Sequence, residues 1–498
     1  MTQTTYEVVI GLEAHAQLAT RTKLFCGCST RFGAPPNTQT CPVCTGQPGS
    51  LPVLNRAAFE HALKTALALN CRINRHTALD RKNYYYPDLP KNYQISQNYL
   101  NLGVDGFIDL EVDGSTRRVR IHNVHLEEDA GKLLHPEDVA ESTLFELSAE
   151  ERAALAGMTL VDLNRAGTPL CEIVTQPDLR SVEEARVYME TLASMLLYLG
   201  VSDCKMQEGS LRFEASISLR PAGAAEYGNR VEIKNVNSMK AVVRALEYEA
   251  KRQADHLSHG ERVARETRLW DDSAGRTAPM RSKEEAHDYR YFPEPDLVPV
   301  EVDEAWLERV RAAIPELAPA RRRRFAEQLG LPPYDAAVLA EDRGIADYFE
   351  ECVRLGAEPK AASNWVMGSV LRELKARGIA VGQLPAPPAA LVELIRLVAE
   401  GAVAPNTAKE VFAEMAATGR PPAEIVESRG LRQISDAQEL EAVVLRVLRE
   451  HPKAVADLRQ GRRQAQGFLM GQVMRATGGK ANPQAVTALI AKKLPEID

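Results

Sequence analysis

Hydrophobic and polar residues alternate along several segments of the first 295 residues. The clearest alternating runs cover residues 6–18, 211–219 and 231–234. Successive side chains of a β-strand point to opposite faces, so these runs predict strands of a sheet with one buried and one polar face. The first half of the chain is therefore expected to be built around a sheet.

Helical spacing appears once within this region and dominates after it. One helix is predicted to begin at Ser181, which forms a capping box with Glu184, and to end at Gly200. Residues 291–299 are rich in proline, which is typical of a domain exit. From Glu304 onward the chain is rich in Ala, Leu, Glu and Arg with helical spacing, and strand patterns are almost absent.

A second break, at residues 382–388, divides the helical part. Helices are predicted over 390–400 and 407–418, and each is followed by a glycine that favours a helix end. The sequence thus predicts an α+β protein with three domains. They are an α+β domain over residues 1–295, an all-helical domain over 296–400 and a helical tail over 401–498.

The polar face of the first predicted strand carries groups that could bind a metal ion. Glu13, His15 and Gln17 share this face. Alternate residues on one face of a strand are about 7 Å apart, so one divalent ion can lie between Glu13 and His15. A polar sheet edge that faces solvent is the alternative interpretation.

The second predicted strand favours the metal interpretation. Arg212, Glu214 and Ser216 share its polar face, and Glu208 and Ser210 precede it. Carboxylates that hold Mg²⁺ beside cations that neutralise phosphate oxygens are typical of a Mg²⁺–nucleotide site.

Two further segments add charge. Residues 80–91 combine three cations, Lys82 and Lys91 among them, with three consecutive tyrosines; an exposed loop with aromatic anchors is the alternative. Residues 125–132 contain three carboxylates, and the pattern there does not decide whether Glu127 or Glu128 faces an ion.

Four cysteines near the N-terminus predict a structural zinc site. Cys26 and Cys28 form one close pair, and Cys41 and Cys44 form another after a loop rich in Pro, Asn and Thr. Two such pairs complete a tetrahedral shell of four sulfurs, which leaves no open position for catalysis. Two disulfides or four buried thiols are the alternative. The absence of a secretion signal argues against disulfides and predicts a cytoplasmic protein.

Charge and missing motifs restrict the function. The net charge of −7 is mild, and no apolar run is long enough to predict a membrane span. Residues 452–498 nevertheless contain eight Lys and Arg against three carboxylates, a net +5 that is typical of contact with a phosphate backbone, although a solvated helix face is the alternative. No P-loop, dinucleotide fingerprint, nucleophile elbow or glutaminase cysteine occurs, so we expect no amide hydrolysis by a nucleophile of this chain.

Taken together, these segments resemble the GatB/GatE family, whose members are components of the aminoacyl-tRNA amidotransferases. The resemblance covers nearly the whole chain in order and in similar spacing. Its residues are Ile10–His15, Leu24–Cys28, Asp80–Asp88, Tyr93–Gln97, Leu126–Lys132, Val161–Leu170, Glu208–Arg212, Glu232–Ser238, Asp288–Asp296, Ser363–Trp365 and Gly467–Gln472.

The resemblance implies a fold and a reaction. The first domain would be a glutamine-synthetase-like cradle with an antiparallel sheet, followed by a helical domain and a YqeY-like tail that holds tRNA. ATP would phosphorylate the side-chain carboxylate of misacylated Glu-tRNA(Gln) or Asp-tRNA(Asn), and ammonia would then form the amide. A GatA-like amidase would supply ammonia through a channel, and a small GatC-like subunit would complete the complex.

The resemblance also implies residue roles. Glu13, His15, Glu128 and Glu208 match metal-binding positions for Mg²⁺. Lys82, Ser210 and Arg212 resemble the residues that handle phosphate, and Lys91 resembles a group at the ammonia entrance. Glu214 departs from the family pattern, which has Asp there. In the basic tail we expect tRNA contacts from Arg459, Arg462, Arg463, Arg475 and Lys480.

Two other functions stay open from the residues alone. One is a stand-alone ATP-dependent carboxylate–amine ligase for a small molecule, and the other is a zinc-containing RNA-binding protein without catalysis. The separate helical tail argues against the first, because a small-molecule ligase needs no such arm. The acidic and basic sheet face argues against the second, because RNA adhesion does not require grouped carboxylates.

Overall fold

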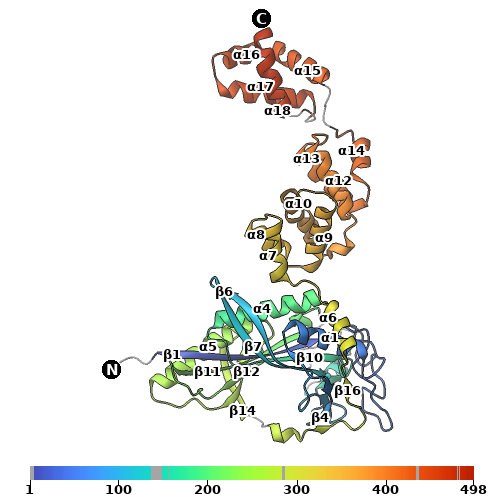
Figure 1. Cartoon of the computed structure of the whole chain (residues 1–498), viewed down its shortest axis with the longest axis vertical. Coiled ribbons are helices and arrows are strands. Elements are labelled where there is room, and N and C mark those ends of the chain that lie inside the picture. The colour runs from blue at the N-terminus through green and yellow to red at the C-terminus, as the bar shows by residue number, and fades with distance from the viewer. Residues whose placement is uncertain are drawn as a thin grey trace. The chain divides into compact units, whose positions relative to one another are not determined.

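The chain forms two compact units, residues 1–317 and 318–498. The computed structural model describes residues 5–135, 148–155, 158–282, 286–432, 437–478, 481 and 483–497 (Figure 1).

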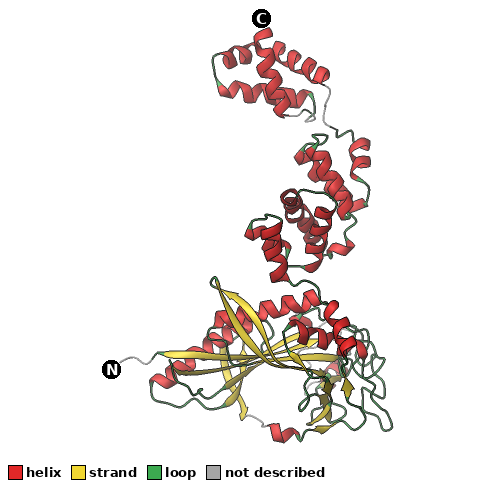
Figure 2. Ribbon diagram, viewed as in Figure 1, coloured by secondary structure: helices red, strands yellow, loops and turns green. Residues whose placement is uncertain are grey.

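In the described part of the first unit, a nine-stranded sheet forms the frame. Figure 2 shows its strands as yellow arrows. Its neighbouring strands are antiparallel, except that β12 and β13 are parallel. In spatial order the strands are β14 (Arg276–Ser282), β13 (Glu266–Asp271), β12 (Val231–Lys234), β11 (Leu211–Pro221), β1 (Tyr6–Gln17), β10 (Pro169–Thr175), β7 (Ser115–Glu128), β6 (Gly103–Val112) and β2 (Arg72–Ile73). The three alternating runs of the sequence are the strands β1, β11 and β12, as predicted.

Helices α1 (Arg56–Ala68), α4 (Val182–Leu199) and α5 (Met239–Ser258) pack on the apolar face of this sheet. Leu12, Ala14 and Ala16 of β1 are buried in the shared core. The opposite face of β1 therefore carries the polar residues, as the alternation predicts.

Helix α4 begins and ends where the sequence predicts. The Ser181 side chain accepts a hydrogen bond from the Glu184 backbone N–H at 3.0 Å, and Gly200 ends the helix with a left-handed φ of 68°. The expected capping box is altered in one respect. The Glu184 carboxylate accepts from the N–H of Arg180, one residue before the cap, at 2.6 Å.

Short strands and helices surround the main sheet. Three small sheets pair β15 (Phe292–Pro293) with β4 (Asp80–Asn83) and β5 (Tyr93–Ser96), β16 (Val300–Glu301) with β3 (His76–Thr77), and β8 (Lys132–Leu134) with β9 (Leu160–Asp162). The helices are α3 (Ala149–Leu155), η2 (Met206–Glu208), η3 (Ala286–Tyr289) and α6 (Glu304–Ala312).

The first unit extends beyond the expected boundary at residue 295. Helix α6 packs on α1, with the Trp306 ring 5.2 Å from the Phe59 ring and Trp306 Nε1 donating to Glu60 at 2.9 Å. Leu307 and Val310 are buried in the same core as the sheet. The proline-rich stretch before α6 is thus a surface connection within the unit, and the boundary lies at Leu317.

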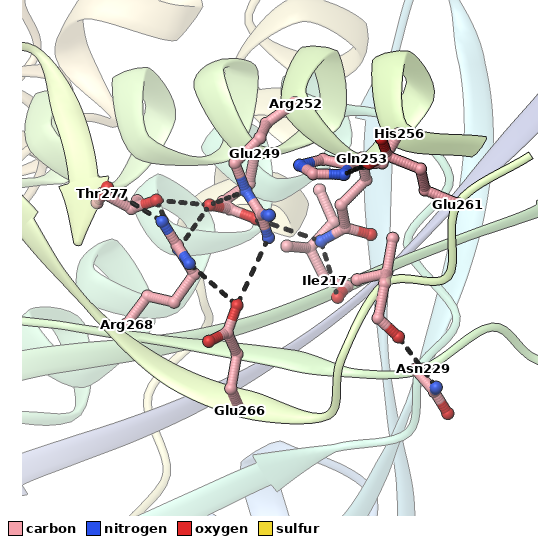
Figure 3. A network of polar contacts seen from close by, with 11 residues as sticks. Ile217, Asn229, Glu249, Arg252, Gln253, His256, Glu261, Glu266, Arg268 and Thr277 are labelled. Atoms are coloured by element: carbon pink, nitrogen blue, oxygen red, sulfur yellow. Dashed lines mark hydrogen bonds and ion pairs between the residues drawn. The ribbon is translucent and has the colours of Figure 1, made fainter. Parts of the chain in front are cut away.

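A buried polar network fastens α5 to the outer strands of the sheet (Figure 3). The fully buried Glu249 carboxylate accepts hydrogen bonds from Arg252 at 2.9 Å and lies 3.2 Å from Nε of Arg268. Arg268 of β13 also donates to the Thr277 carbonyl oxygen and to Glu266. Each charge in the network has a partner of opposite charge, which offsets the cost of burying it.

The described part of the second unit is helical. Its helices are α7 (Ala318–Gln328), α8 (Pro333–Leu339), α9 (Arg343–Arg354), α10 (Pro359–Trp365), η4 (Val366–Val370), α11 (Leu371–Arg377), η5 (Val381–Gln383), α12 (Pro388–Ala399), α13 (Pro405–Thr418), α14 (Pro422–Ser428), α15 (Ala437–Glu450), α16 (Pro452–Arg459), α17 (Arg463–Ala476), α18 (Pro483–Lys493) and η6 (Leu494–Glu496). None of the described helices of the chain is long and apolar enough to span a membrane.

The expected boundary at residue 400 is corrected by the core. One apolar core runs from Phe325 to Val426, and a separate core runs from Leu440 to Ile497. The proline-rich break at 382–388 lies inside the first of these cores, where Ala386 is buried and the Tyr348 hydroxyl donates to its carbonyl oxygen at 2.8 Å. The tail therefore begins after α14 and not after α12.

Candidate active site and zinc site

Strand register brings four charged side chains into one row across the polar face of the sheet. Arg212 of β11 lies opposite His15 of β1, His15 lies opposite Glu172 of β10, and Glu172 lies opposite His125 of β7. Nε2 of His15 lies 3.4 Å from the Glu172 carboxylate, and Nε2 of His125 lies 3.2 Å from the same oxygen. Glu13 is next to this row, 3.3 Å from His15.

Together with Glu13 and Glu127 on the same face, the row forms two groups of described residues that could hold a metal ion, and Glu172 belongs to both. One consists of Glu13, His15 and Glu172, and the other of His125, Glu127 and Glu172. In each group the ligand atoms lie within 4.8 Å of one another. Carboxylate oxygens suit Mg²⁺, and imidazole is tolerated as an additional ligand. The residues present therefore fit a divalent ion.

The protonation of this row is strongly coupled. Burial raises the pKa of Glu13 to about 8, and the charge of Glu172 adds to this rise. Burial alone would lower the pKa of His15, but its hydrogen bond to Glu172 and the neighbouring negative charges raise it to about 9. For Glu172 burial is outweighed by His125 and His15, which hold its pKa well below the usual range. Glu172 is thus the anionic centre of the row.

The two consecutive glutamates at the end of β7 have different surroundings. Glu127 joins the polar row, and its carboxylate lies 3.2 Å from Nζ of Lys82 on β4. Glu128 instead accepts from Lys91 and, at 2.9 Å, from the backbone N–H of Ile95. The structure therefore does not bring the predicted ligand Glu128 together with Glu13 and His15; Glu127 lies instead in the second group, with His125 and Glu172.

Lys91 and Glu128 line a cavity of about 120 Å³, together with Phe25, Cys44 and Gly46 among others. Gly46 has a left-handed φ of 67°, and a Cβ atom there would lie 2.6 Å from Cγ of Lys91. Only glycine allows this close approach of the second cysteine knuckle to Lys91. The cavity therefore connects the surroundings of the cysteine cluster with the Lys91–Glu128 pair.

One N–H group of Arg212 is paired, and another is not satisfied by any described residue. Its Nη2 donates to Asp129 at 3.0 Å, and the charges of Arg212 and Arg165 outweigh burial and lower the pKa of Asp129. Within the described part of the chain, the buried Nε of Arg212 has no hydrogen-bond partner. A buried unsatisfied donor on a cation fits an anionic ligand such as a phosphate oxygen.

The remaining predicted residues of this face lie beside the row. Ser210 donates to Asp203 and accepts from the Lys205 N–H at 2.8 Å. The structure does not bring Glu208 into either ligand group of the described residues; its carboxylate accepts from Lys205 at 3.0 Å. Glu214 lies opposite Glu13 in the register and pairs with Lys234 at 2.9 Å.

Aromatic rings surround Lys82. Its Nζ lies 6.0 Å from the ring centre of Tyr84 and 5.4 Å from that of Tyr289. Burial would lower the pKa of Lys82, but the charge of Glu127 raises it well above the ordinary value. Lys82 is therefore a cation held in a partly desolvated, aromatic environment beside the row.

The four predicted zinc ligands come together. The sulfurs of Cys26, Cys28, Cys41 and Cys44 lie within 4.8 Å of one another, and those of Cys41 and Cys44 are 4.0 Å apart. All cysteines are free thiols, and the hydrogen bond to Cys26 lowers the pKa of Cys44 to about 4. Nζ of the fully buried Lys23 lies 3.5 Å from the Cys44 sulfur. The hydrogen bond between Cys26 and Cys44 also raises the pKa of Cys26, so the two sulfurs share a proton. The compact arrangement of the four sulfurs is what fits tetrahedral Zn²⁺.

The predicted tRNA contacts of the tail have different settings. Arg459 donates to the carbonyl oxygens of Leu494 and Ile497, so its guanidinium fastens the end of the chain. Arg462 pairs with Asp457 at 3.0 Å, and Arg475 is exposed. Arg463 begins α17, but its side chain and the whole of Lys480 lie outside the described residues.

The sequence predictions missed Glu172 and His125. Glu172 is a single carboxylate within the otherwise apolar run Leu170–Val174, and this isolated charge was a usable signal. His125 and Glu127 alternate along β7, but that strand was not predicted. Glu172 becomes a neighbour of His15, and His125 a neighbour of Glu172, only through pairing between strands that are far apart in sequence.

Comparison with known proteins extends these findings. Residues 8–308 match the family model described as "GatB/GatE catalytic domain", and residues 347–494 match the one described as "GatB domain". The chain is 51% identical over 492 residues to the GatB-type component of the aspartyl/glutamyl-tRNA(Asn/Gln) amidotransferase of Carboxydothermus hydrogenoformans, covering 99% of both chains. It is 53% identical over 489 residues to the corresponding component of the Moorella thermoacetica enzyme, covering 98% of this chain and 100% of the relative. With both parts matched and half of all residues identical, the chain belongs to the GatB/GatE family of tRNA amidotransferase components.

Proposed function

We propose that the chain amidates misacylated tRNA, converting Glu-tRNA(Gln), Asp-tRNA(Asn) or both to the correctly paired aminoacyl-tRNA. The row Arg212–His15–Glu172–His125 is the observation that carries the proposal, because it combines metal ligands with a cation that has an unsatisfied donor. Membership of the family supports the choice of substrate.

The chemistry requires activation of a carboxylate. A carboxylate does not react with ammonia directly, because oxide is a poor leaving group. Transfer of the γ-phosphoryl group of ATP forms an acyl phosphate, and ammonia then displaces phosphate to give the amide. Charge on the phosphoryl oxygens must be neutralised, and water must be kept from the acyl phosphate.

The residues of the row would divide this work. Glu13, His15, Glu172, His125 and Glu127 would hold Mg²⁺, which when bound neutralises phosphate oxygens. Nε of Arg212 would donate to a phosphate oxygen of ATP, since it lacks another acceptor among the described residues. Lys82 would supply a second cation, and the tyrosines around it would limit the access of water.

Ammonia has to come from elsewhere, since the sequence contains no glutaminase motif. We propose a GatA-like amidase as its source and a GatC-like subunit as the third component. Lys91 would lie on the path of ammonia, and its pair with Glu128 in the cavity supports this position. From the side of Lys91 and Glu128, ammonia would reach the opposite side of β7, where Glu127 faces the row and the acyl phosphate would form.

The other parts have supporting roles. The four cysteines would hold a structural Zn²⁺ that shapes the wall of the Lys91 cavity. The basic tail would hold tRNA through its phosphates, with Arg475 exposed for such a contact. Free thiols and a reaction that depends on ATP and tRNA suit the cytoplasm.

The deciding experiment is amidation by the reconstituted complex. Asp-tRNA(Asn) and Glu-tRNA(Gln) are supplied in parallel with ATP and glutamine, and the amide product is measured after release from tRNA. Amidation of at least one substrate, lost in Glu13→Ala while tRNA remains bound, is the expected result. If the complex amidates neither tRNA substrate but amidates a small free carboxylate, the stand-alone ligase would be favoured. If it binds RNA without forming any ATP-dependent product, the non-catalytic alternative would be favoured.

A further inference from the structure

A cavity in the tail lies where three helices meet. It has a volume of about 480 Å³ and is lined by residues from the end of α15, the start of α16 and the first two turns of α17. The side chains that matter for its chemistry are His451, Lys453, Asp457, Arg462, Gln464 and Phe468. None of them belongs to the amidation site.

Phe468 is an aromatic ring in the wall of this cavity. It is 47% exposed, whereas Leu469 beside it is fully buried in the tail core. The His451 ring stands nearly perpendicular to it, with ring centres 5.3 Å apart and an angle of 85°. Exposing an aromatic ring to water is unfavourable, so a ring positioned in a cavity wall by a neighbour is typical of a surface that stacks on a flat ligand.

The charges around the ring are mixed. Lys453 and Arg462 are exposed cations, but Asp457 pairs with Arg462 at 3.0 Å and Glu450 also lines the cavity. Carboxylates would repel a phosphate lodged inside, whereas the edge of a nucleobase offers N–H donors that a carboxylate accepts. The amide of Gln464 can serve either kind of group. The cations at the rim would meet the phosphates on each side of the base.

We propose that this cavity holds one unstacked nucleobase of the bound tRNA, which stacks on Phe468. The inference rests on the proposed function, because it assigns a base contact to a tail that is otherwise expected to bind phosphates. RNA is recognised by proteins mostly where single-stranded loops present unstacked bases to aromatic side chains. The cavity would therefore make the tail selective for a tRNA loop over regular duplex RNA.

Phe468→Leu tests the stack in the full amidotransferase complex. It keeps an apolar side chain and removes the ring, and unchanged thermal unfolding shows that the tail is folded. The dissociation constant of tRNA should rise on the order of 10- to 100-fold, the loss of one base–aromatic stack. The slope of affinity against salt should stay as in the wild type, because no phosphate contact is lost, whereas Arg475→Ala should reduce it.

Two further variants separate stacking from other effects. Phe468→Trp should restore affinity, and tRNA should quench the fluorescence of the added indole beyond the change seen in the wild type. Tyr334→Leu removes a ring that is 72% exposed on α8, outside the cavity, and should leave tRNA affinity unchanged.

The outcomes distinguish this inference from the proposed function. If the wild-type complex amidates tRNA and the Phe468→Leu complex binds tRNA with normal affinity, the stacking contact is refuted and the proposed function is retained. Wild-type complex that neither binds nor amidates tRNA would overturn both. Loss of a partner protein from the Phe468→Leu complex in gel filtration, with normal tRNA affinity, would mean that a peptide occupies the cavity. If adenosine monophosphate reverses the fluorescence change that tRNA causes in Phe468→Trp, the two compete for the cavity, which would support a nucleobase site.

Discussion

Glu172→Gln is the sharpest test of the candidate active site. The substitution keeps the size of the side chain and the position of β10, but it removes the negative charge between His15 and His125. It also removes the carboxylate that both candidate ligand groups share. The rise in the pKa of His15 from 6.5 to about 9 corresponds to about 3 kcal/mol in favour of the imidazolium, and its largest favourable cause is Glu172.

Losing a ligand common to both groups should weaken Mg²⁺ binding and misplace the phosphates of ATP. A missing metal clamp of this kind costs several kcal/mol in the barrier, so phosphorylation should slow on the order of 10³-fold or more. The assay follows the γ-phosphoryl group of labelled ATP into the aminoacyl-tRNA carboxylate in single-turnover mode. Calorimetric titration with Mg²⁺ gives a second readout that does not depend on turnover.

Glu7→Gln is the matched control. Glu7 is on the same polar face of β1 and is a carboxylate paired with Arg220 and Arg180, but it belongs to neither ligand group of the described residues. It should leave both readouts near the wild-type values. If Glu172→Gln also transferred phosphate at the wild-type rate with unchanged Mg²⁺ affinity, the row would be structural. The reaction would then have to be assigned to another part of the sheet.

Further predictions concern protons, zinc and stability. Around pH 7 the metal-free site holds a proton on His15, with a pKa of about 9, and one on Glu13, with a pKa of about 8. Both protons must leave when the residues bind a metal ion, so Mg²⁺ affinity should rise from pH 7 to 9. Calorimetry that detects no proton release on Mg²⁺ binding would contradict this. Cys41→Ser should abolish zinc binding, which contributes on the order of 10 kcal/mol to local folding, and expose the loop between the cysteine pairs to proteolysis; wild-type protein without zinc by metal analysis would refute the site. Glu249→Gln should lower the free energy of unfolding at pH 7 by about 3 kcal/mol, because it removes the buried negative charge shared by Arg252 and Arg268 and leaves both with Glu266 alone. The exposed control Glu261→Gln should cost less than about 1 kcal/mol. Hydrogen bonds from Arg252 and Thr277 outweigh burial and depress the pKa of Glu249 below its usual 4.5. The contribution of Glu249 to the free energy of unfolding is therefore present above about pH 4.5 and is lost as the pH falls further. A difference in urea unfolding between wild type and Glu249→Gln that persists unchanged in acid would be inconsistent with this.

Local periodicity determined those parts of the protein that depend on one segment at a time. The strands β1, β11 and β12, the cap at Ser181 and the helix end at Gly200 follow from side-chain spacing and backbone preference. The four cysteines could be assigned to one cluster because each knuckle is a local turn, and only one partner pair was available. The polar face of β1 was predictable for the same reason, since alternation alone decides which side chains share a face.

Tertiary structure decided what depends on pairing between distant segments. Glu172 stands beside His15 only because β10 pairs with β1 in one register, and a shift of one residue would turn its side chain to the core. The choice between Glu127 and Glu128 depends on the register of β7 in the same way. The proline-rich stretches have the same composition whether they end a domain or turn within a core. Leu307, after the first stretch, and Ala386, in the second, are both buried in apolar cores. Both stretches therefore lie within a packed unit, and only tertiary packing decides this.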